Sequence, residues 1–175
     1  DGEGFLASML APTGAAPGPF IDSLEGRRVL LLGAGGSARA VGYAIASRLK
    51  GGELIICNRT VQSARELAGA IAQRGASTCA IGESELEAAA LSADLIVNST
   101  TKGQGGQQRL AGGKILTMEA YSALASADPT PVAESASGKA DSEDPAARQA
   151  AADIRANQQA SLALAEKIPQ ATRFY

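Results

Sequence analysis

The chain has 175 residues and a formal net charge of −2, and 45% of its residues are hydrophobic although only 3% are aromatic. This length allows one domain with a proper core, which must be built from Ala, Leu, Ile and Val. The basic residues are spread along the chain, so the composition indicates no nucleic-acid-binding surface, and no apolar run approaches the ~20 residues that span a bilayer. The absence of His removes the commonest general base and metal ligand, and we expect no metal site.

The two cysteines, Cys57 and Cys79, lie in apolar segments without the spacing of metal ligands. We interpret them as reduced core residues of a cytoplasmic protein. Residues 1–25 predict a short N-terminal helix and a linker, because apolar side chains recur at helical spacing before a stretch rich in Pro and Gly. The chain starts on Asp1 without a methionine, which we interpret as a fragment, a processed form or a chain with preceding residues left out.

A strand, a glycine turn and the start of a helix are predicted next. The run Val29 to Leu32 is apolar at successive residues, as in a parallel strand covered on both faces. Gly33 and Gly35 allow a tight turn that a ligand can approach closely, and a helix starting near Gly36 directs its free N–H groups at that ligand. This arrangement suits a pyrophosphate, and the third position of the dinucleotide fingerprint holds the small residue Ala38. An ordinary strand–turn–helix is the alternative. The cofactor contacts that we predict here are Gly33, Ala34, Gly35, Gly36, Ser37 and Ala38.

The end of the second predicted strand, Glu53 to Cys57, indicates which dinucleotide binds. An acidic residue at this place binds the 2′-hydroxyl of the adenosine ribose in many dinucleotide folds. Here Asn58 and Arg59 follow the strand, and a guanidinium pairs with a 2′-phosphate through charge-assisted hydrogen bonds. The sequence therefore predicts NADP rather than NAD. The alternative is a solvated arginine at the start of the next helix, for which Thr60 would be the N-cap.

The remaining pattern completes an α/β domain. We predict a helix over 61–73, a strand over 77–81, a short helix over 83–91 and a strand over 93–98. The last of these strands ends in a polar loop in which Asn98 and Thr100 contact the cofactor ribose or nicotinamide, unless they serve turn chemistry alone. Residues 26–102 thus form the best-defined core, and the predicted fold is a doubly wound, Rossmann-like, mostly parallel sheet flanked by helices.

The pattern weakens beyond residue 102. Residues 103–145 predict an irregular excursion, with one or two helical turns over 118–124. Asp144 and Pro145 predict the N-terminus of a helix that runs over 146–168. Its inward residues should be Ile154, Leu162, Ala165 and Ile168, and residues 171–175 resemble the first half of another strand. The whole chain, 1–175, is interpreted as a single NADP-binding domain.

Three blocks of this sequence together resemble the shikimate dehydrogenase family. They are Asp1-Gly2-Glu3-Gly4-Phe5, Gly33-Ala34-Gly35-Gly36-Ser37-Ala38-Arg39-Ala40 and Asn58-Arg59-Thr60, and the strand that ends in Asn98-Ser99-Thr100 is similar to the family's Asn-x-Thr loop. The resemblance implies NADPH-dependent reduction of 3-dehydroshikimate to shikimate, or oxidation of shikimate or quinate. It also implies that Asp1 matches the family's catalytic aspartate. The catalytic lysine belongs to an N-terminal substrate domain that this sequence lacks, so we expect the chain alone to bind cofactor without turnover.

The sequence departs from the family pattern in two places. The family often has a second basic residue five positions after the Asn, where this chain has Ser63, and Arg65 is the candidate replacement. The resemblance is also poor after about Gly103. Two alternatives therefore stay open. One is a related Rossmann enzyme such as a glutamyl-tRNA reductase or a methylene-tetrahydrofolate dehydrogenase. The other is a non-catalytic nucleotide-binding or regulatory module.

Overall fold

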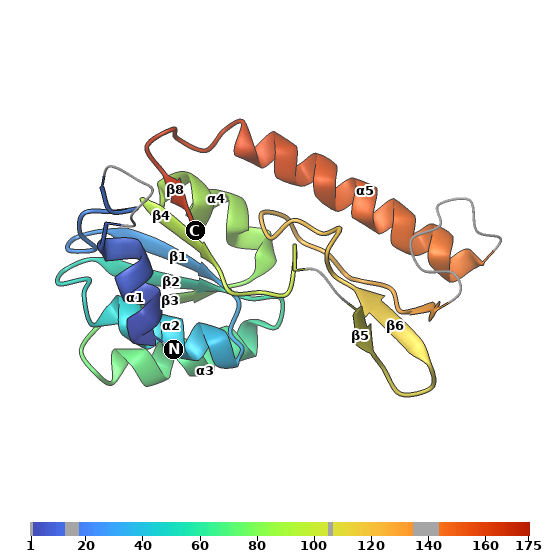
Figure 1. Cartoon of the computed structure of the whole chain (residues 1–175), viewed down its shortest axis with the longest axis horizontal. Helices are drawn as coiled ribbons and strands as arrows, with labels where there is room; N and C mark the ends of the chain where they lie inside the picture. The colour runs from blue at the N-terminus through green and yellow to red at the C-terminus, as the bar shows by residue number, and fades with distance from the viewer. Residues whose placement is uncertain (1, 13–17, 105–106, 135–143) are drawn as a thin grey trace. The chain divides into compact units, whose positions relative to one another are not determined.

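The computed structural model describes residues 2–12, 18–104, 107–134 and 144–175. Where the sequence suggests one domain, the chain divides into two compact units. Unit 1 contains residues 1–100 and 168–175, and unit 2 contains residues 101–167. Each unit is described by itself below (Figure 1). Among the described residues, no helix combines the length and the apolar character needed to cross a membrane.

Unit 1 is built on a five-stranded parallel sheet with the order β3-β2-β1-β4-β8. The apolar runs of the three central strands are buried, as expected for strands that helices cover on both faces. The predicted doubly wound α/β sheet is confirmed. The strands are β1 (Arg28–Leu32), β2 (Glu53–Cys57), β3 (Ser77–Ile81), β4 (Leu95–Asn98) and β8 (Arg173–Phe174).

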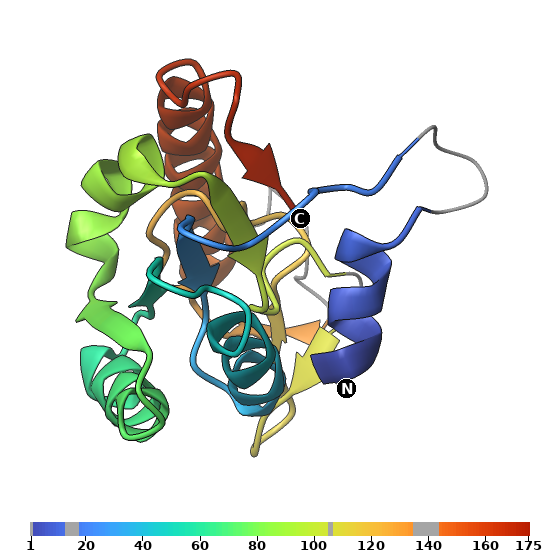
Figure 2. The same cartoon turned by 90° about the vertical axis from the view of Figure 1, so that its left-hand side faces the viewer.

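Helices cover both faces of this sheet. They are α1 (Gly2–Leu10), α2 (Gly36–Ala46), α3 (Val61–Ala72), the 3₁₀ turn η1 (Glu83–Glu85) and α4 (Leu86–Ser92). Figures 1 and 2 show α2 and α3 on one face and α4 on the other. The helix α1 packs on α2 at close range, because a Cβ added to Gly2 would lie 2.7 Å from the carbonyl oxygen of Ala40 and 2.9 Å from the Cβ of Ala44. Glycine at position 2 therefore allows the two helices to touch.

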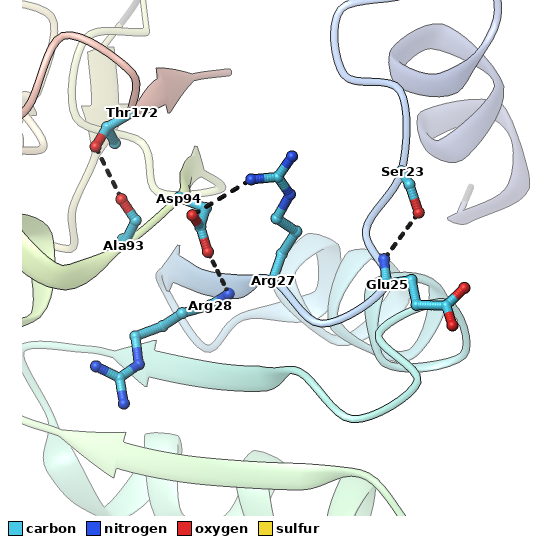
Figure 3. Close-up of polar contacts among 7 residues, drawn as sticks. All are labelled: Ser23, Glu25, Arg27, Arg28, Ala93, Asp94 and Thr172. Atoms are coloured by element: carbon cyan, nitrogen blue, oxygen red, sulfur yellow. Dashed lines mark hydrogen bonds and ion pairs between the residues drawn. The ribbon is translucent and has the colours of Figure 1, made fainter.

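Polar contacts join the strands at the amino edge of the sheet, where the parallel strands begin (Figure 3). The Asp94 carboxylate accepts a hydrogen bond from the backbone N–H of Arg28 at 2.8 Å and lies 3.5 Å from the Arg27 guanidinium. Thr172 donates its hydroxyl proton to the carbonyl oxygen of Ala93 at 2.8 Å, just before β8 joins β4. These contacts fix the register of β1 and β8 against β4, and they leave the carboxyl edge for a ligand.

Unit 2 contains a three-stranded antiparallel sheet and one long helix. The strands are β5 (Gln107–Arg109), β6 (Lys114–Thr117) and β7 (Val132–Ala133), and the helix is α5 (Pro145–Ala165). The segment 103–145, predicted as an irregular excursion, thus contains three short strands among its described residues, and the helical turns predicted over 118–124 are not formed. The predicted N-cap is confirmed, because the Asp144 side chain accepts a hydrogen bond from the backbone N–H of Ala146 at 3.0 Å.

The inward face of α5 differs from the predicted one. Leu162, which was predicted to point inward, is 67% exposed, while Asn157 is 3% exposed and Ser161 is 8% exposed. Asn157 accepts a hydrogen bond from the N–H of Ser122 at 2.7 Å and donates to three carbonyl oxygens of the segment 122–126 at 3.0–3.2 Å. The face is polar because this segment presents backbone groups, which side-chain amides can satisfy and leucines cannot.

Candidate functional site

The register of the sheet brings the predicted site segments together. Leu32, the last residue of β1, is paired with Cys57 of β2 on one side and with Asn98 of β4 on the other. The glycine turn, the Asn58 segment and the Ser99 loop therefore leave the sheet at the same edge. The strand order reverses between β1 and β4, and in open parallel sheets ligands bind beside this switch point.

The glycine turn has one position that requires glycine and two that leave open space. Gly33 has φ +107°, and a Cβ added there would lie 3.0 Å from Ser99 Oγ and 3.2 Å from the Ser99 backbone. Its N–H donates to the carbonyl oxygen of Cys57 at 2.8 Å. A Cβ added to Gly35 or Gly36 would meet no atom within 4 Å. Gly33 is thus a packing requirement, whereas the space over Gly35 and Gly36 is available to a ligand.

The helix α2 starts directly after this turn. Gly35 is its N-cap and supplies no side-chain cap, and the carbonyl oxygen of Gly35 accepts the N–H of Arg39 at 3.0 Å. The first N–H groups of a helix have no partner within the helix, and together with the helix dipole they attract anions. Ala38 is fully buried, as expected of the small residue that lets α2 approach the sheet. The turn therefore fits a phosphate group.

The segment after β2 combines a fixed turn with two exposed cations. Asn58 donates through its amide nitrogen to the carbonyl oxygen of Thr60 at 3.0 Å, and its own N–H donates to the carbonyl oxygen of Ile81 at 3.2 Å. Thr60 is the N-cap of α3, although its hydroxyl makes no capping bond. Arg59 and Arg65 are exposed, and neither side chain has a hydrogen-bond or ion-pair partner within the described part of the chain. Both guanidinium groups are thus available to an anion.

The loop after β4 is shaped by its own side chains. The N–H and the hydroxyl of Ser99 both donate to the carbonyl oxygen of Leu32, at 2.9 and 2.8 Å. The Asn98 side-chain oxygen accepts from the N–H of Thr100 at 2.9 Å and from its hydroxyl at 2.7 Å. Ser99 therefore supports the glycine turn through its two hydrogen bonds to Leu32. A single sequence does not reveal this role, because Ser99 and Leu32 are far apart along the chain.

The predicted catalytic residue, Asp1, lies outside the described residues. The start of α1 can nevertheless be placed, because Gly2 contacts Ala40, which lies one turn into α2. The aromatic ring of Tyr175 meets Phe5 edge to face at 5.3 Å, which ties α1 to the chain that follows β8. The first turn of α1 thus lies beside the helix that leaves the glycine turn.

Two electrostatic features belong to unit 2. Burial raises the pKa of the Tyr121 hydroxyl well above its usual range, and the hydrogen-bonded carboxylate of Asp153 raises it further. Arg109 and Glu134 form an exposed ion pair at 2.7 Å, which lowers the pKa of the Glu134 carboxyl mainly through their hydrogen bond. Within the described ranges, no group of three or more His, Cys, Asp or Glu side chains could hold a metal ion.

A parallel sheet with a glycine turn at its switch point, a helix N-terminus over that turn and free arginines beside it define the dinucleotide-binding α/β class. A model of the shikimate / quinate 5-dehydrogenase family matches residues 19–105. Through this segment the chain belongs to the shikimate/quinate 5-dehydrogenase family.

Individual relatives agree with this assignment. Shikimate dehydrogenase (NADP(+)) of Moorella thermoacetica is 40% identical over 106 residues, which are 59% of this chain and 33% of that protein. The same enzyme of Carboxydothermus hydrogenoformans is 63% identical over 60 residues, which are 30% of this chain and 20% of that protein. The chain thus spans about a third or less of the length of these relatives.

Solved structures are also similar to the chain. Shikimate dehydrogenase from Aquifex aeolicus aligns at a TM-score of 0.42 with 29% identity, covering 59% of this chain and 32% of that one. Quinate dehydrogenase from Corynebacterium glutamicum in complex with NAD aligns at a TM-score of 0.41 with 28% identity, covering 45% of this chain and 28% of that one.

Proposed function

We propose that unit 1 is the NADP(H)-binding part of an oxidoreductase that interconverts a cyclic hydroxy acid of the shikimate or quinate type and its ketone. The observation that carries the proposal is the register of β1, β2 and β4. It gathers the glycine turn, Arg59 and the Asn98–Thr100 loop at one edge of the sheet. The names of the NADP(+)-dependent relatives support the choice of cofactor and substrate class.

The residues present fit a 2′-phosphorylated dinucleotide. The first N–H groups of α2 and the open space over Gly35 and Gly36 would hold the pyrophosphate. Arg59 would bind the 2′-phosphate through two parallel hydrogen bonds, with Arg65 as a second cation. Thr100 and Asn98 would face the ribose or nicotinamide. When bound, the cofactor donates or accepts the hydride, and the chain holds it in place.

The substrate would need a second domain. We propose that Asp1 acts together with a lysine of an N-terminal substrate domain, so that the pair moves the proton of the reacting hydroxyl. We also propose a cytoplasmic location. Neither Cys57 nor Cys79 is in a disulfide, and disulfides are uncommon in that compartment.

The cofactor assignment is tested by titrating the chain with NADPH and with NADH. We expect tighter binding of NADPH, and Arg59→Ala should weaken NADPH binding by roughly 10- to 100-fold, since a hydrogen bond to a charged group contributes about 1.5–3 kcal/mol. NADH binding should change little, because NADH lacks the 2′-phosphate. Arg65→Ala should show a smaller loss in the same direction.

The matched control is Arg148→Ala, which removes an exposed arginine from α5 in unit 2. It should leave both affinities unchanged. Equal losses of NADPH and NADH affinity in Arg59→Ala would rule out the assignment of Arg59 to the 2′-phosphate.

A further inference from the structure

A cavity lies in unit 1, at the opposite edge of the sheet from the glycine turn. Its volume is about 460 Å³, within the usual range for small-molecule sites. It is formed where α2 and α3 end and where β2 and β3 begin. We call it the amino-edge pocket, and its polar lining consists of Tyr43, Ser47, Lys50, Arg74 and Ser77.

The lining suits an anion with an apolar body. Ala46 and Ala76 are half-buried and supply apolar surface beside the half-buried Tyr43 ring. Lys50 and Arg74 supply two positive charges, and none of the described residues that line the pocket carries a carboxylate. The Arg74 guanidinium stacks over the Tyr43 ring at 4.3 Å, which holds it in place and leaves its N–H edge free to bind a carboxylate.

The backbone at Lys50 gives an independent reason to assign a ligand. Lys50 has φ +35°, and among the described residues it is the only one other than glycine with a positive φ. Glycine adopts this conformation without strain, whereas a lysine is strained there, and strained residues often lie at functional sites. Its partner Glu25 lies 4.0 Å away, and both side chains are more than 60% exposed, so this ion pair compensates little.

We propose that the amino-edge pocket binds a small organic monocarboxylate that carries an aromatic or cyclic ring, at a site separate from the cofactor. The carboxylate pairs with Arg74 and Lys50, and the ring packs against Ala46 and Ala76. The helix ends tolerate this charge because their last carbonyl oxygens are already bonded, as when Ile71 accepts the N–H of Arg74 at 2.9 Å.

The probe for this site is benzoate, titrated into the ¹⁵N-labelled chain and followed by backbone amide shifts. We expect shifts around Gly51 and Gly75 and a dissociation constant of roughly 1 mM or tighter, as suits a ligand of this size. Benzyl alcohol lacks the charge and inorganic phosphate lacks the ring, so both should bind at least roughly tenfold more weakly. NADPH should not compete. Shifts confined to the glycine turn, or equal binding of the three probes, would overturn the proposal.

Two variants separate binding from folding. Arg74→Gln should weaken benzoate binding by roughly tenfold. Lys50→Gly should also weaken it, yet raise the thermal midpoint, because glycine relieves the positive φ. The control Arg48→Gln changes an exposed neighbour that does not line the pocket, and benzoate binding should be unaffected. Unchanged benzoate affinity in Arg74→Gln and Lys50→Gly would show that the pocket holds no carboxylate.

Discussion

At the scale of single residues, the glycines of the turn have different tasks. Gly33 adopts φ +107° and faces Ser99 so closely that an added Cβ would be crowded. Gly35 has φ −80° and faces open space. The sequence motif makes them equivalent, and it predicts that both lie close to a ligand. Only the packing of Ser99 against the turn separates the structural glycine from the one that clears space.

This difference predicts that substitution of Gly33 lowers stability, whereas substitution of Gly35 lowers cofactor binding. Gly33→Ala should lower the free energy of unfolding by roughly 1–3 kcal/mol, because alanine is strained at that φ and its Cβ meets the β4 loop. Gly35→Ala should leave the free energy of unfolding within about 0.5 kcal/mol of the unsubstituted chain. It should nevertheless abolish NADPH binding, since its Cβ occupies the space over the turn. Urea unfolding and an NADPH titration measure the two quantities. A stable Gly33→Ala variant would contradict the packing role.

At the scale of elements, the sequence correctly predicts the strands and helices whose buried residues follow a regular apolar pattern. The strands β2 and β3 have the predicted bounds, and α3 differs at one end by a single residue. The helix α5 shows where this reasoning fails. The capping signal at Asp144 is local and could be recognised in the sequence. The inward face of the helix is instead set by backbone groups of the segment 122–126, and the apolar pattern of the helix contains no information about them. The same limit applies to β5, β6 and β7, which are only two to four residues long and show no clear apolar alternation.

The polar face of α5 can be tested by substitution. Asn157→Leu should destabilise unit 2 by roughly 3 kcal/mol, because it removes the acceptor of the part-buried Ser122 N–H and a donor to the carbonyl oxygen of Ser122. Gln159→Leu, an exposed position on the same helix, is the matched control and should change the free energy by less than about 0.5 kcal/mol. Hydrogen exchange of the Ser122 amide measures the local effect. Equal protection in both variants would show that the Asn157 network contributes nothing.

The phenol of Tyr121 makes the stability of unit 2 dependent on alkaline pH. Its pKa in the folded chain is raised above the ordinary value of 10.0, so the folded chain keeps the proton to higher pH than the unfolded chain. The stabilisation is complete below pH 10.0 and is lost as the pH rises above it. We expect the free energy of unfolding to fall more steeply above that pH in the unsubstituted chain than in Tyr121→Phe. Urea titrations across the alkaline range measure the slopes, and identical slopes would refute the prediction.

At the scale of the whole molecule, the candidate cofactor residues all lie in unit 1, whereas the chain spans a third of the length of its Moorella relative. Cofactor binding and catalysis should therefore separate. The cofactor site needs only strands and turns that unit 1 contains. Turnover needs groups that hold the substrate beside the nicotinamide, and we propose that these come from another domain.

This separation can be measured on the chain and on a longer protein that contains it. The chain alone should bind NADPH without oxidising shikimate or quinate, and addition of an N-terminal substrate domain should give NADP-dependent oxidation. Asp1→Asn in the longer protein should lower kcat by at least roughly 100-fold, as expected for loss of a proton-transfer group, and leave NADPH affinity unchanged. Cofactor binding without turnover in the longer protein would favour a non-catalytic nucleotide-binding module.

The pairing of β4 with β8 has a consequence for engineering this chain. Two parallel neighbours need a crossover of a dozen or more residues, since the chain must return to the opposite edge of the sheet before the next strand starts. Residues 101–167 supply that return path, and the sheet constrains only where the path leaves β4 and where it enters β8. A plain crossover helix should serve equally well there, so unit 2 is a natural place to graft a foreign module onto a dinucleotide-binding scaffold.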